Sequence, residues 1–124
     1  MINSKIKNSE LLYELSKLGE SDSFVIVNSE FPCSKDVKVI DLSLTDNVPN
    51  LIDVMQVIFT EVESTDITFP EEISGVDKEE YSKMSCLNNL KYLTYRQFKI
   101  VAKNAKFIVR TGDIKKYNNL IVIV

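Results

Sequence analysis

The sequence predicts an α/β fold: a single-domain layered fold with a central β-sheet flanked by helices on both faces. The chain has 124 residues, of which 44% are hydrophobic and 27% are charged, and these values are typical of one globular domain with one packed core. Short segments rich in β-branched residues alternate with segments that are apolar at helical spacing. No repeat, low-complexity tract or linker interrupts residues 1–124, which we therefore treat as one domain.

The first half of the chain is predicted to hold two helices and two strands. Ser9 is followed by four leucines at helical spacing and then by Gly19, which indicates a helix with Ser9 as its N-cap and Gly19 as its stop signal. Residues 24–27 and 37–42 are rich in β-branched and other apolar residues, which predicts two strands. Pro49 opens a second helix, because proline suits the first helical turn and an apolar stripe follows it.

The second half of the chain continues this alternation. The predicted elements are a strand at 66–69, a helix at about 78–87, a strand at 90–93, a helix at 96–104 and strands at 106–109 and 120–124. The helix at 78–87 has the weakest pattern, because only Tyr81, Met84 and Leu87 share one side of it. Strands and helices joined by short connections predict layers, with helices on both faces of a sheet.

The composition excludes several classes of chemistry. The chain has no histidine, so it cannot by itself form a Ser-His-Asp or a Cys-His nucleophile system. Its two cysteines, Cys33 and Cys86, form no C-x-x-C pair, which excludes a zinc ribbon and a thioredoxin-like motif. We interpret both as reduced structural thiols of a cytosolic protein.

Charge and hydropathy exclude two kinds of partner. The net charge is −3 and the lysines are scattered, whereas a nucleic-acid groove needs concentrated positive charge. The longest apolar run, residues 120–124, is far shorter than the roughly 20 residues of a membrane helix. The polar start of the chain lacks a signal-peptide core. We therefore expect a cytoplasmic protein that binds neither nucleic acid nor membrane.

A series of short motifs runs through the chain in a characteristic order and spacing. They are Asn8-Ser9, Leu18-Gly19, Asp22, Pro32, residues 40–44, Val48-Pro49, Glu61, Glu71-Glu72-Ile73, Gln97-Phe98-Lys99, Arg110-Thr111-Gly112 and Tyr117-Asn118-Asn119. Together they resemble the ribose pyranase and fucose mutarotase family of sugar ring-form isomerases over nearly the whole chain. The match runs without a gap to about Ile73, and residues 75–89 form a shorter segment than in the family.

The resemblance implies a function and a set of sugar-binding residues. It implies interconversion of the ring forms or anomers of a free aldose, such as ribose or fucose, by acid–base opening of the hemiacetal without cofactor or metal. It also implies a ring-shaped homo-oligomer with the sugar site between neighbouring subunits. The sugar contacts it implies are Tyr95, Lys99, Tyr117 and Asn119, of which Tyr117 and Asn119 would serve a neighbouring subunit's pocket.

Three positions depart from the family pattern. Glu20 stands where the family has its catalytic His, Asn28 where it has the partner Asp, and Tyr95 where it has a further sugar-contacting His. We predict that Glu20 acts as the base, with its pKa raised by burial from about 4.3 toward neutrality. Asn28 would hold Glu20 by an amide hydrogen bond and avoid the like-charge repulsion that an Asp would cause. Tyr95 or Lys99 would protonate the ring oxygen.

These departures leave two alternatives open. The alternatives to an isomerase are a catalytically silent sugar-binding or regulatory relative, and a protein of the same fold whose pocket serves another small ligand or assembly alone. Without the resemblance, Glu20 is a solvated loop carboxylate and Lys99 a surface lysine. We expect Arg110 to be structural and to bridge to an acidic residue, and Gly112 to allow a close backbone approach.

Overall fold

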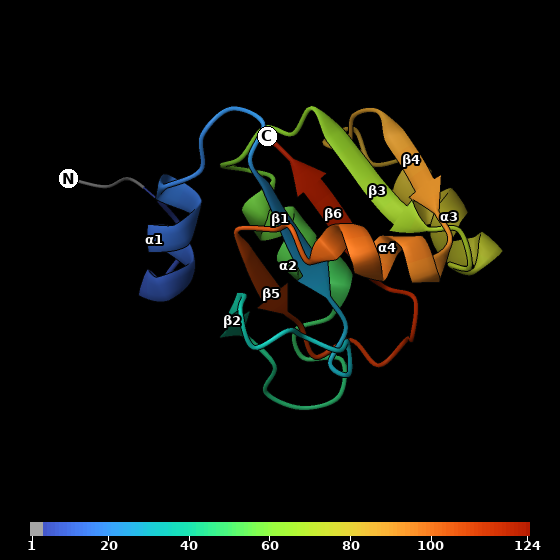
Figure 1. Cartoon of the computed structure of the whole chain (residues 1–124), viewed down its shortest axis with the longest axis horizontal. Helices are drawn as coiled ribbons and strands as arrows, with labels where there is room; N and C mark the ends of the chain where they lie inside the picture. The colour runs from blue at the N-terminus through green and yellow to red at the C-terminus, as the bar shows by residue number, and fades with distance from the viewer. Residues whose placement is uncertain (1–3) are drawn as a thin grey trace.

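The computed structural model describes residues 4–124, which form one six-stranded sheet in the order β2-β5-β1-β6-β3-β4 (Figure 1). The strands are β1 (Ser23–Val27), β2 (Lys38–Asp41), β3 (Asp66–Pro70), β4 (Leu90–Leu93), β5 (Phe107–Arg110) and β6 (Leu120–Ile123). The helices are α1 (Ser9–Ser16), α2 (Leu51–Ile58), α3 (Gly75–Ser82) and α4 (Tyr95–Ala102). All six predicted strands are present, each within a residue or so of its expected bounds.

The direction of the strands gives the sheet two different ends. β1 and β2 run parallel to β5, and β3 runs parallel to β4. β6 lies between β1 and β3 and is antiparallel to both. Five strands therefore point the same way. We call the end of the sheet at which these five strands finish the carboxyl end, and the opposite end the amino end.

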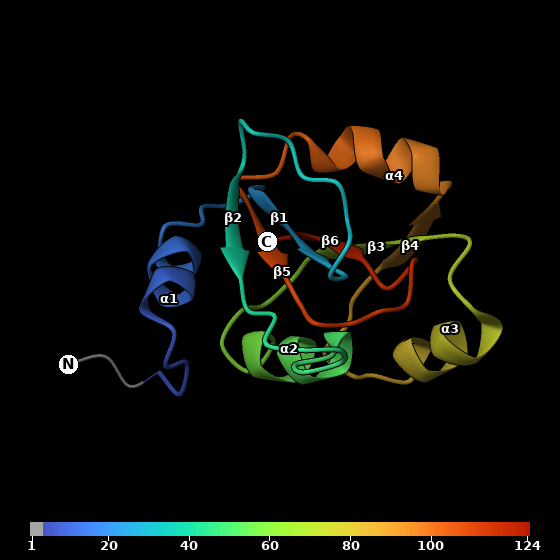
Figure 2. The ribbon, with the colours of Figure 1, turned by 90° about the horizontal axis from the view of Figure 1, so that it is seen from below.

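Helices cover both faces of the sheet, as the sequence predicted. Figure 2 shows α4 on one face and α2 and α3 on the other. The side chains of β1 alternate accordingly: Phe24 and Ile26 join the core beneath α1, α2 and α3, whereas Val25 and Val27 join the core beneath α4. Burial on both faces explains why this strand reads as a continuous apolar run.

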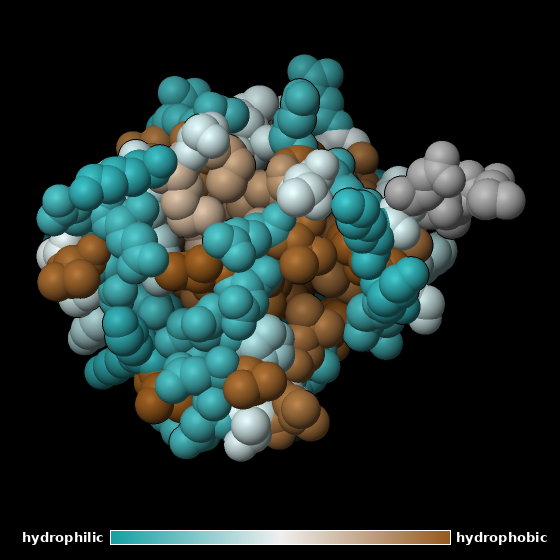
Figure 3. Space-filling model, turned by 180° about the vertical axis from the view of Figure 1, so that it is seen from behind, coloured by the Kyte–Doolittle hydropathy of each residue, from teal (hydrophilic) through white to brown (hydrophobic). Residues whose placement is uncertain are grey.

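The face that carries α1 and α2 keeps some apolar surface. Apolar side chains are visible on it in the space-filling view (Figure 3), where a shallow groove between the two helices is lined by Ile6, Leu11, Leu42, Val54 and Val57, among others. Nothing in residues 4–124 forms a helix with the length and hydropathy that crossing a bilayer requires.

Two helices begin at a different residue from the predicted one. The N-cap of α1 is Asn8, whose Oδ1 accepts a hydrogen bond from the Leu11 amide, and not Ser9. The helix ends at Ser16, before the expected stop at Gly19. In α2 the N-cap is Asn50, so Pro49 precedes the helix instead of opening it. In both helices an asparagine is the N-cap, because its side-chain oxygen accepts a hydrogen bond from a free backbone N–H of the first turn.

The weakest predicted helix is displaced toward the N-terminus. α3 spans Gly75–Ser82 and is capped by the Ser74 hydroxyl, which accepts from the Asp77 amide. The prediction of 78–87 was wrong at both ends, because Met84 and Leu87 pack against the core from the turn that follows the helix. An apolar side chain in such a turn imitates helical spacing.

Candidate functional site

Five of the six candidate residues lie at the carboxyl end of the sheet. Asn28 directly follows β1, Tyr95 begins α4 just after β4, and Lys99 lies one turn further along α4. Tyr117 and Asn119 lie in the segment that leads into β6. Because β6 is antiparallel, its beginning meets the ends of its neighbours, and this brings residues distant in the sequence together.

Direct contacts join these five residues in two groups. In the first group, the backbone N–H of Asn28 donates to Oδ1 of Asn119 at 2.8 Å. The rings of Tyr95 and Tyr117 meet edge to face, with centroids 5.2 Å apart, and Nζ of Lys99 lies 4.8 Å from the centroid of the Tyr95 ring. Asn28 and Asn119 are 3% and 0% exposed, whereas the other three are partly exposed. The two asparagines thus support the site, and the two tyrosines and the lysine are accessible to a ligand.

The side chain of Asn28 forms hydrogen bonds with the segment that carries Tyr117 and Asn119, residues 111–119. Nδ2 of Asn28 donates to the carbonyl oxygens of Lys115 at 2.9 Å and Lys116 at 2.6 Å. Each of these hydrogen bonds satisfies a backbone acceptor, and loss of the donor would leave those carbonyls without it. Asn28 therefore helps to fix the main chain next to Tyr117.

A buried carboxylate, that of Asp113, holds the same segment from within. It accepts hydrogen bonds from the amide of Lys115 at 3.0 Å and from Nδ2 of Asn118 at 3.1 and 3.2 Å. It also accepts from the amide of Leu51, the first residue of α2, at 3.0 Å. A negative group is favourable there because helix N-termini carry partial positive charge. One side chain thus ties residues 111–119 to α2.

A third connection reaches α3. Nζ of Lys115 lies 3.0 Å from the buried carboxylate of Asp77. The nearby ring of Tyr81 stacks on Phe69, with centroids 5.2 Å apart. Burial, reinforced by the negative charges of Asp77 and Asp113, raises the pKa of Tyr81 well above its usual range. Its hydroxyl therefore stays protonated throughout the neutral pH range.

The start of α4 is capped by an acidic residue from another segment. Both carboxylate oxygens of Glu72 accept from the amide of Tyr95, at 2.9 and 3.0 Å, and the Thr94 side chain caps the same helix. Burial, with a smaller contribution from Tyr117, raises the pKa of the Tyr95 phenol. The phenol is thus a protonated hydrogen-bond donor at neutral pH.

Glu20 lies apart from the other five residues. It is exposed in the loop that precedes β1, at the amino end, whereas Asn28 follows β1 at the carboxyl end. A five-residue strand spans roughly 16 Å. The prediction that Asn28 holds Glu20 is therefore wrong within one chain, because the strand separates them and the Asn28 amide group serves the carbonyls of Lys115 and Lys116. The expected burial of Glu20 is also absent from the single chain.

Two structural expectations are confirmed beside the site. Nη1 of Arg110 donates to the carbonyl of Ser29 at 2.7 Å, and its Nε lies 4.0 Å from the Asp41 carboxylate. A Cβ on Gly112 would lie 2.5 Å from the carbonyl oxygen of Thr45, so only glycine fits this close backbone approach. Both residues shape the loops around the site.

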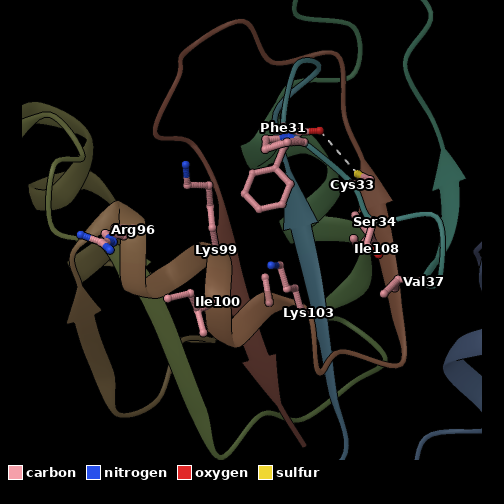
Figure 4. Close-up of a pocket in the computed structure, with 11 residues that line it drawn as sticks. Phe31, Cys33, Ser34, Val37, Arg96, Lys99, Ile100, Lys103 and Ile108 are labelled. Carbon is pink, nitrogen blue, oxygen red and sulfur yellow. Dashed lines mark hydrogen bonds between the residues drawn. The ribbon is translucent and has the colours of Figure 1, made fainter.

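A cavity of about 530 Å³ adjoins the cluster (Figure 4). We call it the α4 cavity. Its lining comes from α4 and its C-cap, from the segment after β1 and from β5: Phe31, Pro32, Cys33, Ser34, Val37, Arg96, Lys99, Ile100, Ala102, Lys103 and Ile108. Lys99 belongs both to this cavity and to the cluster. The Phe31 ring lies edge-on to that of Tyr95, with centroids 6.3 Å apart.

Several supporting residues escaped the sequence analysis. Asp113, Asp77 and Asn118 are buried and hydrogen-bonded, yet in the sequence each looks like an ordinary loop or surface residue. Glu72 belongs to one of the motifs of the resemblance, but nothing in the sequence indicates that its carboxylate caps α4. Such tertiary partners leave no local pattern in a sequence.

The arrangement is suited to a small, neutral molecule rich in hydroxyl groups. A phenol, an ammonium group and the edges of two aromatic rings offer hydrogen-bond donors beside apolar faces. Fold and site together define a single-domain α/β protein with a candidate ligand site at the carboxyl end of its sheet. The chain belongs to the RbsD / FucU transport protein family, whose model matches residues 1–124.

Individual relatives agree with this assignment. The chain is 33% identical over 123 residues to a D-ribose pyranase of Staphylococcus haemolyticus, covering 98% of this chain and 95% of that protein. It is 34% identical over 121 residues to a D-ribose pyranase of Bacillus cereus, covering 94% and 92%.

Two solved structures resemble the fold. RbsD of Bacillus subtilis complexed with D-ribose superposes with a TM-score of 0.90 at 31% identity and covers 100% of this chain and 97% of that one. The fucose mutarotase of Streptococcus pneumoniae in complex with L-fucose gives a TM-score of 0.71 at 23% identity, covering 93% and 90%. The second likeness supports the fold alone.

Proposed function

We propose that this chain interconverts ring forms or anomers of a free aldose, ribose-like or fucose-like, at the carboxyl end of its sheet. The observation that carries the proposal is the cluster of Tyr95, Lys99 and Tyr117 on a base of two buried asparagines. Relatives named D-ribose pyranase and a structural neighbour holding D-ribose support the choice of substrate.

The reaction needs one group to remove a proton and one to supply it. A base takes the proton of the anomeric hydroxyl while an acid protonates the ring oxygen, and the open aldehyde then recloses. Tyr95 is the acid in our proposal, because its partly exposed phenol is an O–H donor beside Lys99 and Tyr117. Lys99 lies over the Tyr95 ring and would donate a hydrogen bond to a sugar oxygen. Tyr117 packs against Tyr95 and would cover one sugar face.

The base is Glu20 of a neighbouring copy in this proposal. Glu20 is exposed at the amino end, and Asn28, Tyr95, Lys99, Tyr117 and Asn119 lie at the carboxyl end. A contact between the amino end of one copy and the carboxyl end of the next is head-to-tail, and head-to-tail contacts form a ring when the rotation between successive copies closes. A ring-shaped homo-oligomer would therefore complete each site with Glu20 from the adjacent subunit.

The state of the cysteines favours a cytoplasmic location for the protein. Cys33 and Cys86 are both free thiols, which suits a reducing compartment such as the cytoplasm.

Exchange between sugar ring forms tests the proposal directly. Saturation-transfer NMR on ribose, then fucose and other aldoses, should show faster exchange with the protein than without it. Glu20→Gln should bind the sugar without accelerating exchange, while Glu63→Gln, an exposed loop carboxylate, should behave as wild type. Full activity in Glu20→Gln would remove Glu20 from the mechanism. Line broadening of the sugar without acceleration by the wild type would instead identify a silent sugar-binding protein.

Mixed oligomers test where the base comes from. Glu20→Gln and Lys99→Gln subunits should each be inactive alone. After unfolding and refolding together in equal amounts, about a quarter of the shared sites should contain both native side chains, and activity should return to that extent. No recovery in mixtures that demonstrably co-assemble would contradict a site shared between Glu20 of one subunit and Lys99 of the next.

A further inference from the structure

The α4 cavity concentrates positive charge on a protein that is negative overall. The chain has a net charge of −3, yet Arg96, Lys99 and Lys103 all line this one cavity. Their spacing of three and four residues places them along one side of α4. Within residues 4–124, the cavity lining contains no aspartate or glutamate.

These three cations lack acidic partners in the part of the chain that the structure describes. Some of the other lysines form ion pairs within 4.0 Å, among them Lys91 with Asp66 and Lys115 with Asp77, whereas no such pair includes Arg96, Lys99 or Lys103. The Asp41 carboxylate near Cys33 faces Arg110. Three like charges around one cavity repel one another, and an anionic ligand would relieve that repulsion.

The rest of the lining is apolar and continues toward the sugar site. The apolar lining includes Phe31, Val37, Ile100 and Ile108, and Figure 4 shows Lys99 to the left of the Phe31 ring and Lys103 below it. Phe31 lies against Tyr95. A cavity of about 530 Å³ is within the usual size range for a small organic ligand.

We propose that the α4 cavity binds the phosphate group of a phosphorylated monosaccharide. Lys99, Lys103 and Arg96 would neutralise the phosphate dianion, whose two negative charges a single cation does not balance. The Arg96 guanidinium would also donate paired hydrogen bonds to the phosphate oxygens. The sugar would extend past Phe31 toward Tyr95. The identity of the sugar part rests on the proposed function above. Because Lys99 serves both places, a phosphorylated sugar excludes the free aldose.

Direct binding tests the phosphate site without any measurement of activity. Ribose 5-phosphate, inorganic phosphate and ribose are titrated separately into the intact protein by calorimetry, and phosphorus NMR follows the phosphate signals. Ribose 5-phosphate should bind more tightly than inorganic phosphate. The double variant Arg96→Gln/Lys103→Gln changes two exposed side chains and should weaken ribose 5-phosphate binding about tenfold or more. Lys17→Gln/Lys83→Gln, with the same change in charge on α1 and α3, should bind it as wild type does.

Several results would overturn the proposal. Undetectable binding of ribose 5-phosphate, or equal weakening by both double variants, would exclude a phosphate site in this cavity. Equal affinity for inorganic phosphate and ribose 5-phosphate would exclude the sugar part.

Competition then separates this inference from the proposed function. In the wild type, ribose 5-phosphate should slow the catalysed exchange of free ribose, and Arg96→Gln/Lys103→Gln should keep basal exchange but lose this inhibition. Binding of ribose 5-phosphate that leaves exchange unchanged would overturn the shared role of Lys99. If the wild type accelerates no aldose, the proposed function fails, while the titrations still decide the phosphate site.

Discussion

The two ends of the sheet are built on different principles. At the carboxyl end, Asn28, Asp113, Asn118 and Asn119 are buried and hydrogen-bonded to one another or to nearby backbone. At the amino end the ion pairs join exposed lysines to partly exposed aspartates, as in Lys106 with Asp22 at 3.9 Å. Buried polar groups are costly to disturb, whereas exposed pairs contribute little. The chain thus fixes the geometry of one end and leaves the other, which carries Glu20, available for contact with another molecule.

The largest expected effect comes from removing the carboxylate of Asp113. Asp113→Ala leaves the amides of Leu51 and Lys115 and the side chain of Asn118 without their buried acceptor. We expect a loss of about 3 kcal/mol or more in the free energy of unfolding, measured by urea denaturation. Asp66→Ala removes a carboxylate at the amino end, where its partner Lys91 is exposed, and should cost less than about 1 kcal/mol. Similar losses in the two variants would refute the contrast between the ends.

Replacing Asn28 by the family's aspartate should have the next largest effect. In Asn28→Asp, a carboxylate oxygen would face the carbonyls of Lys115 and Lys116 in place of the donor that now binds them. We expect a loss of about 2 kcal/mol at neutral pH. The loss should shrink in acid, since a protonated carboxyl can donate again. Urea denaturation at neutral and acid pH measures both, with the exposed Asn104→Asp as control. A stability equal to that of the wild type would show that residues 111–119 do not depend on this donor.

Alkaline pH probes the buried region between α3 and the site. The pKa of Tyr81 is raised above its ordinary value of 10.0 by burial and by Asp77 and Asp113, so the fold favours the neutral phenol. This contribution is complete below pH 10 and is lost as pH rises further. At about pH 11 the wild type should lose about 1 kcal/mol more than Tyr81→Phe, relative to neutral pH. Parallel pH profiles of the two proteins would contradict the burial of this hydroxyl.

The smallest effect is expected at the amino end. Lys106 is exposed and lies 3.9 Å from Asp22, so Lys106→Gln should change the free energy of unfolding by less than about 0.5 kcal/mol. The difference should vanish at high salt, because salt screens exposed charges. A loss that exceeds 1 kcal/mol and persists in salt would mean that the amino end is not weakly coupled to the fold.

Much of the fold could be predicted because its signals are local. Strands such as Ser23–Val27 coincide with runs of β-branched and other apolar residues, and burial on both faces makes those runs continuous. Helix starts were less accurate, since Asn50 and Pro49 both suit a helix N-terminus and only the capping geometry separates them. The sequence order also gave no indication that β6 lies between β1 and β3.

The site could be predicted less completely than the fold, because its contacts join residues that are distant in the sequence. Resemblance brought Tyr95, Lys99, Tyr117, Asn28 and Asn119 together, and the structure places all five at one end of the sheet. The pairing of Glu20 with Asn28 failed, although the predicted strand at 24–27 already separated them. Asp113 could not have been found, because its partners are distant in the sequence or belong to the backbone.

The position of β6 has a consequence for how the chain reaches its native state. β6 is the sixth strand in sequence but joins β2-β5-β1 to β3-β4, pairing with Ser23 across one hundred residues of chain. Contacts of such long sequence separation form slowly. Until β6 docks, β1 and β3 both expose unpaired strand edges, which are prone to pair with other chains. Aggregation during synthesis should therefore depend more on the docking of residues 120–123 than on any helix.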